Sequence, residues 1–371
     1  MKKIALLFAI SYSFAAAAQN EHYLLIGTYT SGKSEGIYVY KFNSVTGDNN
    51  FASVAKTSNP SFLAVSPNKK MVYAVNENAD STMHTVGGNI SAFKFDKATG
   101  TLTPINKQPS GGKHPCYVAI DKTGKWIFAG NYTSGTIGLL HANADGSLDT
   151  LKQVIQHQGS GPNTQRQQGP HVHSTVLSAD NKFLYVPDLG IDKVMVYAFD
   201  NKKGILKANS SAASEPGNGP RHFDFSSNNK FAYLMEEMSG TVVCYKVNNG
   251  TLTLQQRINA MPAGFKGKTG SADIHVAPDG KFLYCSNRGE SNTISIFAVH
   301  PTDGKLTLLG HQPTMGNTPR NFNFDPSGNF LLVANQDGNI VIFKRNKLTG
   351  LLTDTGKRID VPNPVCIKWV E

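Results

Sequence analysis

Four short segments of the chain carry side chains that could transfer protons and bind an anion. They are Pro170-His171-Val172-His173, Arg221-His222, Glu236-Glu237 and Arg288. Histidine transfers protons near neutral pH, and a carboxylate can take a proton from water. A guanidinium group can stabilise an oxyanion, or hold a carboxylate or phosphate through two hydrogen bonds. The predicted chemistry is attack of water on a carbonyl group, with Glu237 or a histidine as the base and arginines around the developing charge.

Other chemistries have weaker support in the sequence. His171 and His173 are spaced so that both rings would lie on one face of a strand and could chelate a metal. A third ligand is not evident, so we expect no metal and no cofactor. Neither a Gly-x-Ser-x-Gly segment nor a Ser-His-Asp signature stands out, which favours water over a serine nucleophile. Glu236 and Glu237 form a carboxylate pair whose like charges could raise the pKa of one member.

A repeat explains how these segments meet. Each unit has a Pro or Ser, a short apolar strand, a turn such as Ser-Pro-Asn or Pro-Asp-Gly, and an apolar-aromatic strand that ends in a polar residue. A third strand and a Thr-Gly-x-Leu-like turn follow. The residues that open the first turn recur every 48 to 57 positions: Ser66, Asp121, Ser178, Ser226, Ala277 and Asp325. Four strands in about 50 residues are typical of a β-propeller blade.

Six complete units and one divided unit predict an all-β fold, a seven-bladed β-propeller. The N-terminal segments YLLIGTYT and GIYVYKF lack an innermost strand, and the C-terminal segment VCIKWVE can supply it. We expect the C-terminal strand to join the N-terminal blade and close the ring, which removes an exposed sheet edge. Residues 19–371 are predicted to form one domain.

Strand direction predicts which residues share one opening of the ring. Because the second strand of each blade returns to the rim where the first strand begins, first-strand starts and second-strand ends lie together. This rule collects histidines, arginines and carboxylates at one mouth. The candidate catalytic residues are His171, His173, Arg221, Glu237 and Arg288. The candidate substrate-binding residues are Arg166, His222, Glu236, Asp273, Arg320, Asn131 and Asn287.

Structural roles are the alternatives for several of these residues. Asn131 and Asn287 recur by blade with Asn76 and Asn335, so backbone hydrogen bonding near the turn is the favoured interpretation of this position. Arg320 could equally form a structural salt bridge. Arg221, His222, Glu237 and Arg288 are harder to explain structurally, because unpaired charge beside a narrow channel is costly.

The N-terminus resembles a secretory signal. Lys2 and Lys3 precede a largely apolar run that ends in Ala16-Ala17-Ala18, which predicts a signal peptide over residues 1–18. No later apolar stretch reaches the roughly 18 residues of a membrane span, so a periplasmic or secreted protein is expected. The four cysteines lie in apolar segments, and buried free thiols are the favoured interpretation over disulfides.

The charge balance favours a small anionic partner. Lys and Arg number 36 against 26 Asp and Glu, but they are scattered and form no patch of the kind that binds nucleic acid. A modest positive field fits an anionic small molecule.

Several segments resemble the seven-bladed lactonase family, which contains cycloisomerase-type 6-phosphogluconolactonases and the fungal 3-carboxymuconate lactonizing enzyme. They include GSGPNTQRQQGPHVHS (159–174), GPRHFDF and DIHVAPDGKFLYCSNRG. The resemblance implies that the active-site residues are His171 or His173, Arg221, Glu237 and Arg288. It implies hydrolysis of a small, anionic sugar lactone, as by a 6-phosphogluconolactonase.

Alternative functions remain open at this point. An exported propeller could bind a glycan or a protein without catalysis, since fold does not fix function. A muconate-type lactonizing cycloisomerase is a second alternative. A calcium-dependent, six-bladed gluconolactonase conflicts with the count of seven units.

Overall fold

The computed structural model describes residues 20–79, 81–82 and 85–371, and all its regular elements are β-strands. The predicted signal peptide, residues 1–18, lies outside the described residues. Seven four-stranded antiparallel sheets form the blades. No helix in the described part of the chain is long and apolar enough to cross a membrane.

The first four blades contain the following strands, from the axis outward. Blade 1 has β30 (Pro364–Val370), β1 (Glu21–Thr28), β2 (Gly36–Asn43) and β3 (Asn49–Lys56). Blade 2 has β4 (Leu63–Val65), β5 (Met71–Asn76), β8 (Asn89–Asp96) and β9 (Thr101–Pro109). Blade 3 has β10 (Pro115–Ile120), β11 (Trp126–Asn131), β12 (Thr136–Ala142) and β13 (Leu148–Gln156). Blade 4 has β14 (Val176–Leu177), β15 (Phe183–Asp188), β16 (Lys193–Asp200) and β17 (Ile205–Ala213).

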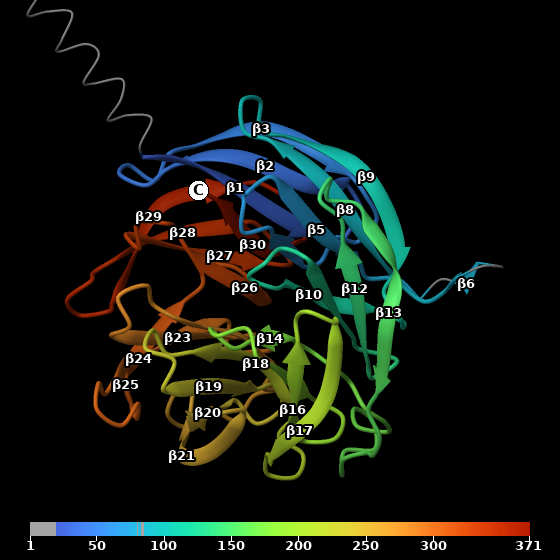
Figure 1. Cartoon of the computed structure of the whole chain (residues 1–371). Coiled ribbons are helices and arrows are strands. Elements are labelled where there is room, and N and C mark those ends of the chain that lie inside the picture. Colours follow the sequence, from blue (N-terminus) through green and yellow to red (C-terminus); the bar gives the residue numbers. More distant parts are fainter. Residues whose placement is uncertain (1–19, 80, 83–84) are drawn as a thin grey trace, which may run out of the picture.

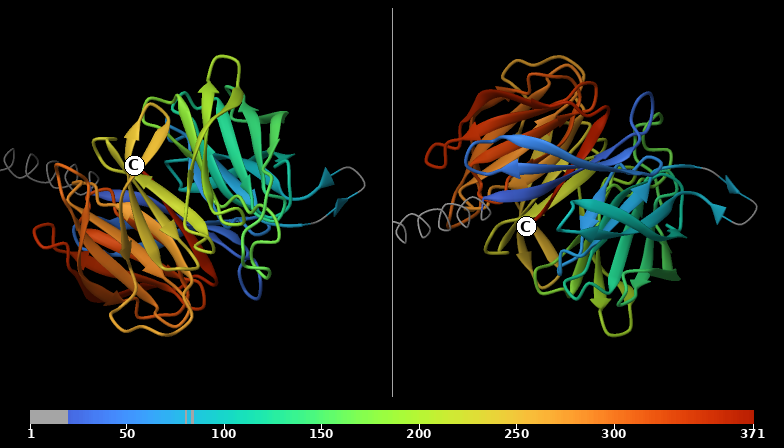
Figure 2. Two further views of the ribbon diagram at one scale, coloured as in Figure 1. Left: turned by 90° about the horizontal axis from the view of Figure 1, so that it is seen from below. Right: turned by 90° about the horizontal axis from the view of Figure 1, so that it is seen from above.

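The other three blades continue this order. Blade 5 has β18 (Pro220–Phe225), β19 (Phe231–Glu236), β20 (Thr241–Asn248) and β21 (Thr251–Asn259). Blade 6 has β22 (Ser271–Val276), β23 (Phe282–Asn287), β24 (Thr293–Val299) and β25 (Leu306–Pro313). Blade 7 has β26 (Pro319–Phe324), β27 (Phe330–Asn335), β28 (Ile340–Arg345) and β29 (Leu352–Ile359). A small hairpin of β6 (Ser81–Thr82) and β7 (Thr85–Val86) projects from the ring (Figures 1 and 2).

The innermost strands meet around a common axis. In Figure 1, β3, β2, β1 and β30 follow one another from the rim toward the centre, as do β29, β28, β27 and β26. Strand β30 contacts both β26 and β4, and β22 contacts both β18 and β26. The blades therefore form the ring that the repeat predicts.

The C-terminal strand closes the ring, as predicted. β30 pairs antiparallel with β1, and the register sets Ile26 opposite Ile367. Figure 2 shows the blue N-terminal strands beside the red C-terminal segment. This pairing covers the inner edge of β1, to which another chain could otherwise add a strand.

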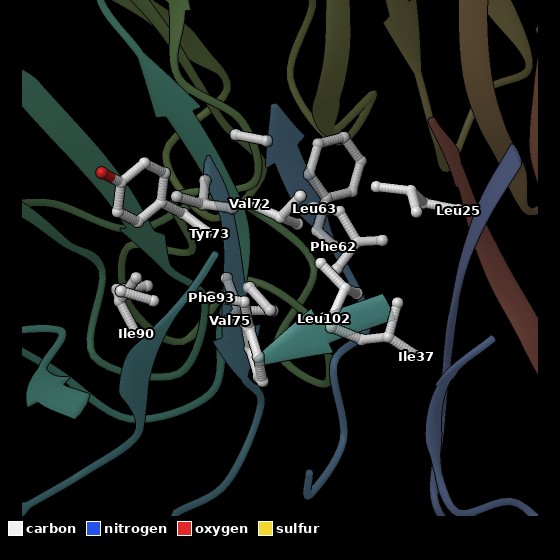
Figure 3. Packing of buried hydrophobic residues seen from close by; sticks show 14 of the residues in the cluster. Leu25, Ile37, Phe62, Leu63, Val72, Tyr73, Val75, Ile90, Phe93 and Leu102 are labelled. Atoms are coloured by element: carbon white, nitrogen blue, oxygen red, sulfur yellow. The ribbon is translucent and has the colours of Figure 1, made fainter. Parts of the chain in front are cut away.

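The core lies between neighbouring blades. Leu25 and Ile37 of blade 1 belong to the same buried cluster as Leu63 and Leu102 of blade 2 (Figure 3). Because each sheet is apolar on both faces, one blade cannot bury its surface alone. Tyrosines on second strands also connect blades: Tyr233, for example, donates a 2.9 Å hydrogen bond to the Gly304 carbonyl of the next blade. This packing fixes the positions of neighbouring blades, and with them the residues at the mouth of the ring.

Candidate active site

A cavity of about 470 Å³ opens at the mouth predicted from strand direction. All seven blades contribute to its wall. The residue directly after the second strand lines it in five blades: Tyr29, Glu77, Tyr132, Glu237 and Arg288. Its volume lies within the range of small-molecule sites, roughly 300–1,000 Å³. The cavity is therefore a suitable place for a sugar-sized ligand.

A β-bulge re-aims one side chain of the first strand in blades 3, 5 and 7. In blade 5, Pro220 pairs with Glu236 and His222 with Met235, so Arg221 has no opposite residue. Cys116 and Arg320 occupy the same bulge position in blades 3 and 7. Cys116 and Arg320 line the cavity. They also line a smaller neighbouring chamber, and Arg221 lies on the wall of that chamber. The bulge thus turns residues of a buried strand toward the axis.

Residues that end the second strand have a structural role instead. The Asn131 amide donates to the Ser110 carbonyl at 3.0 Å, and the Asn287 amide donates to the Ala260 carbonyl at 3.3 Å. Glu236 occupies the equivalent position in blade 5 and accepts hydrogen bonds from Asn218 and Arg257. All three side chains are fully buried and do not line the cavity. The structure does not bring these three candidate contacts to the ligand space.

Glu237 stands at the centre of a cluster of arginines. Its Oε1 is 2.7 Å from Arg166 Nη2, and its Oε2 is 2.9 Å from Arg221 Nε and 3.0 Å from Arg288 Nη2. Burial opposes ionisation of this carboxyl group, but Arg288, Arg221 and Arg166 outweigh it and lower its pKa to about 2. The expectation that the Glu236-Glu237 pair would raise a pKa is wrong for Glu237. The two carboxylates point to different partners, and Glu237 faces three cations.

Arg320 lies on the other side of the cavity without a carboxylate partner. Its guanidinium carbon is 5.3 Å from the centre of the Tyr29 ring. Across the residues that the structure describes, this guanidinium group makes no hydrogen bond or ion pair with protein, so the alternative of a structural salt bridge does not apply. The Tyr29 hydroxyl donates to Glu77 Oε2 at 2.9 Å, and Ser61 contacts the same oxygen. Arg320 therefore faces the cavity with its donors unused.

The two histidines of the Pro170–His173 segment do not share one strand face. Residues 171–175 contain only an isolated bridge at Val172, and β14 begins later, so strand alternation does not apply. His171 stacks on Tyr132 at 4.5 Å and does not line the cavity. His173 lines it, with Nε2 3.9 Å from Glu237 Oε2. Burial and the nearby Arg221 lower the pKa of His173 well below its ordinary value, so its imidazole is neutral.

His222 and Asp273 lie deeper along the axis. His222 Nδ1 is 2.7 Å from Asp273 Oδ1, and both side chains are buried. His222 borders the small chamber that continues from the floor of the cavity, together with Cys116, His173, Arg221, Arg320 and Asn321. Of the predicted site residues, the cavity and this chamber bring together His173, Arg221, Glu237, Arg288, Arg166, Arg320 and His222.

Comparison with known proteins identifies the family. The family model "Lactonase, 7-bladed beta-propeller" matches residues 23–369. This chain belongs to the seven-bladed β-propeller lactonase family. It is 40% identical over 336 residues to a 6-phosphogluconolactonase of Formosa agariphila, with 89% of this chain and 94% of the relative covered. It is 36% identical over 349 residues to a 6-phosphogluconolactonase of Bacillus subtilis, with 93% and 97% covered.

A solved structure of similar shape supports the same assignment. The periplasmic gluconolactonase of Pseudomonas aeruginosa matches with a TM-score of 0.90 and 37% identity, covering 95% of this chain and 99% of that chain. The chain is thus a lactonase, an enzyme that hydrolyses a cyclic ester. The alternative of a non-catalytic binding propeller is therefore wrong.

Two residues that line the cavity, Tyr29 and Cys116, were not among the candidates predicted from the sequence. Tyr29 follows the second strand of the divided blade, so the rule that found Glu237 and Arg288 would also have found it. Cys116 follows Pro115 as Arg221 follows Pro220 and Arg320 follows Pro319. Its apolar surroundings suggested only a buried thiol, which is correct: all four cysteines are free and buried. The shared Pro-x start was the signal that also placed it at the cavity.

Proposed function

We propose that this lactonase hydrolyses an anionic sugar lactone in the cavity at the mouth of the ring, in the manner of a 6-phosphogluconolactonase. The observation that carries the proposal is the set of unused guanidinium donors. Arg320 has no protein partner among the described residues, and Arg221 Nη1 is buried without one. A buried donor without a partner, such as Arg221 Nη1, is costly, and an anionic ligand would give both guanidinium groups an acceptor.

The charge balance of the site supports an anionic substrate. Arg166, Arg288 and Arg320 line the cavity and Arg221 borders its floor, while Glu77 and Glu237 are its carboxylates. Burial lowers the pKa of Arg221 and of Arg288, and repulsion from Arg320 adds to the effect on both. An incoming carboxylate or phosphate would relieve this repulsion and could be held bidentately.

The arginines also suit the chemistry of ester hydrolysis. When water attacks the lactone carbonyl, negative charge develops on the carbonyl oxygen, and fixed cations in a water-poor site stabilise it. Arg288 is well placed for this role because its Nε donates to the Gly270 carbonyl at 2.7 Å and its Nη2 contacts Glu237. These two contacts fix the plane of its guanidinium group.

Glu237 acts in this proposal as the anchor of the arginines. Both of its oxygens accept from guanidinium groups, and a pKa of about 2 makes it a poor proton acceptor. The proton of the attacking water therefore goes to a histidine at the floor, where His173 and His222 lie.

We propose further that the enzyme is exported. The support is the signal-like sequence of residues 1–18 and the existence of a similar periplasmic gluconolactonase in Pseudomonas aeruginosa. Periplasmic or secreted gluconolactones that carry a phosphate group are the proposed preferred substrates, and the neutral gluconolactone is expected to be a poorer one.

The test compares a phosphorylated and an unphosphorylated gluconolactone in the purified, folded enzyme. Wild type should hydrolyse both and prefer the phosphorylated one. Arg320→Ala should raise KM for the phosphorylated lactone by at least tenfold and leave KM for the neutral lactone within about twofold. Arg358→Ala is the matched control, because Arg358 pairs with Asp354 on the outer strand β29. If folded wild-type enzyme hydrolysed neither lactone, the proposed function would be contradicted.

A further inference from the structure

A second, smaller space continues from the floor of the cavity. Its volume is about 10 Å³, at the lower limit for one water molecule. The two spaces share Cys116, His173 and Arg320. The smaller one, here called the axial chamber, therefore lies directly beneath the place where a lactone would bind.

His222 presents an oriented imidazole to this chamber. Its Nδ1 lies 2.7 Å from Asp273 Oδ1, a distance typical of a strong hydrogen bond. No protein group among residues 20–79, 81–82 and 85–371 pairs with its Nε2. When Nδ1 carries the proton toward a carboxylate, Nε2 of a neutral imidazole is an acceptor. His222 can therefore accept a proton from a water in the chamber.

Asp273 is fixed as a charged acceptor. His275 Nε2 lies 3.0 Å from its Oδ2, the Asn321 amide contacts the same oxygen, and the Phe322 backbone N–H donates to it at 3.3 Å. Burial opposes ionisation of Asp273, but the charge of His275 and the hydrogen bonds from both histidines lower its pKa well below the usual range. An ionised Asp273 keeps the Nδ1–H tautomer of His222.

His173, the other histidine of the chamber, has no such partner. Its Nδ1 lies 3.8 Å from Cys116 Sγ, and its Nε2 is 3.9 Å from the nearest Glu237 oxygen, beyond hydrogen-bond distance. An imidazolium formed at His173 would face only Glu237, at 3.9 Å and without a hydrogen bond, and this carboxylate is already shared by three arginines. An imidazolium formed at His222 would keep its hydrogen bond to Asp273.

We propose that His222 is the proton acceptor of the hydrolysis and that Asp273 is its positioning residue. The oxygen of a water in the axial chamber bonds to the lactone carbonyl carbon while one water proton passes to His222 Nε2. The carbonyl oxygen takes the negative charge beside the arginines. When the intermediate collapses, the bond between the carbonyl carbon and the ring oxygen breaks, and the proton returns from His222 to that oxygen. The product is a hydroxy acid, which loses its carboxyl proton to solvent.

This inference rests on the proposed function. If it holds, the pKa of His222 depends on the charge of the bound substrate. Burial and Arg221 lower the pKa of His222 to about 4, against the raising effect of Asp273. The other charged or titratable groups around its ring are His275, Tyr117 and, in the chamber, His173, Cys116 and Arg320. An anion bound to the arginines offsets the effect of Arg221 and raises the pKa of His222. Activity should fall below the His222 pKa, where the imidazole is protonated.

The test is a kinetic comparison of His222→Gln and Asp273→Asn with wild type, using the phosphorylated gluconolactone. His222→Gln should lower kcat by roughly 10²- to 10⁴-fold with little change in KM. Asp273→Asn should lower kcat comparably, because an amide donor at this position favours the Nε2–H tautomer of His222. In wild type, the acid limb of kcat should lie at higher pH than that of kcat/KM for the phosphorylated lactone. The two limbs should coincide for the neutral lactone.

A matched control separates this role from general stability. His157 and Asp188 form another buried histidine–carboxylate pair at 2.7 Å, but neither residue lines the cavity or the chamber. His157→Gln should keep kcat near the wild-type value in protein that is folded by circular dichroism. A folded His222→Gln variant with kcat within threefold of wild type would overturn the inference and leave the proposed function intact. A folded wild type without lactonase activity would overturn both.

Discussion

Replacement of Glu237 by Gln removes the one negative charge shared by Arg166, Arg221 and Arg288 while keeping the shape of the side chain. Glu237 is 5% exposed, so water compensates little for the loss. Its pKa falls from 4.5 to about 2 on folding, and each unit corresponds to 1.36 kcal/mol, which gives about 3 kcal/mol of stability at pH 7. Measured costs of breaking a buried ion pair, about 3–5 kcal/mol, agree with this value.

The pH dependence of this contribution has a defined sign. Because the pKa is lowered in the folded state, the contribution is full above pH 4.5 and is lost as pH falls through about 2. At pH 3, which lies between the two pKa values, less than half of this contribution should remain. Urea unfolding of wild type and Glu237→Gln at pH 7 and pH 3 measures both values.

An exposed ion pair of the same length is the control for this experiment. Lys357 and Asp48 are 2.7 Å apart with largely exposed side chains, and Asp48→Asn should have no measurable effect on urea unfolding. A Glu237→Gln variant that loses less than about 1 kcal/mol at pH 7, or loses the same amount at both pH values, would refute the electrostatic account of the cluster.

Three further predictions concern the ring closure, the thiols and the charge of the site. Deletion of residues 364–371 removes β30 from blade 1, so the truncated chain should show no cooperative urea transition, whereas deletion of the exposed Glu371 alone should keep it. Burial raises the pKa of Cys244 and Cys285 to about 12 and of Cys366 to about 11. A thiol reagent should therefore label none of these three cysteines in the folded enzyme and all three in urea, and rapid labelling of one of them in the folded enzyme would contradict the burial. Raising NaCl from about 0.05 to 0.5 M should raise KM several-fold for the phosphorylated lactone alone, because salt screens the arginines, and an equal rise for the neutral lactone would contradict the charge argument.

The number of blades and the closure of the ring could be predicted from the repeat. A period near 50 residues and the missing inner strand of the first unit lead to seven blades and a C-terminal closure. The prediction worked because blade strands are short, strongly apolar and bounded by turn residues, so sequence pattern and tertiary structure agree.

The site could be predicted only at the level of the mouth. Strand direction placed Glu236 and Glu237 together, but successive residues point to opposite sides, and only Glu237 lines the cavity. Two irregular features of the backbone, which a regular strand pattern does not predict, determine which of the other side chains face the cavity. The bulge at Arg221 re-aims its side chain, and the irregular segment before β14 separates His171 from His173.

The sequence did not predict which charged residues pair with one another. Arg166 lies in a loop and reaches Glu237 across 71 positions of the chain, and Asp273 meets His222 across 51. Residue types alone suggested a raised carboxyl pKa for the Glu236-Glu237 pair, whereas three converging guanidinium groups lower that of Glu237. Such shifts depend on distances that a sequence pattern does not fix.

The proposed function depends on binding of an anionic sugar lactone by the arginines of the mouth cavity. A crystal structure of the enzyme with the stable product 6-phosphogluconate would show this contact. The phosphate or carboxylate of the product should lie within about 3.2 Å of guanidinium nitrogens of Arg320 and Arg288. A product bound elsewhere on the ring, with no contact to Arg320 or Arg288, would rule out this binding mode.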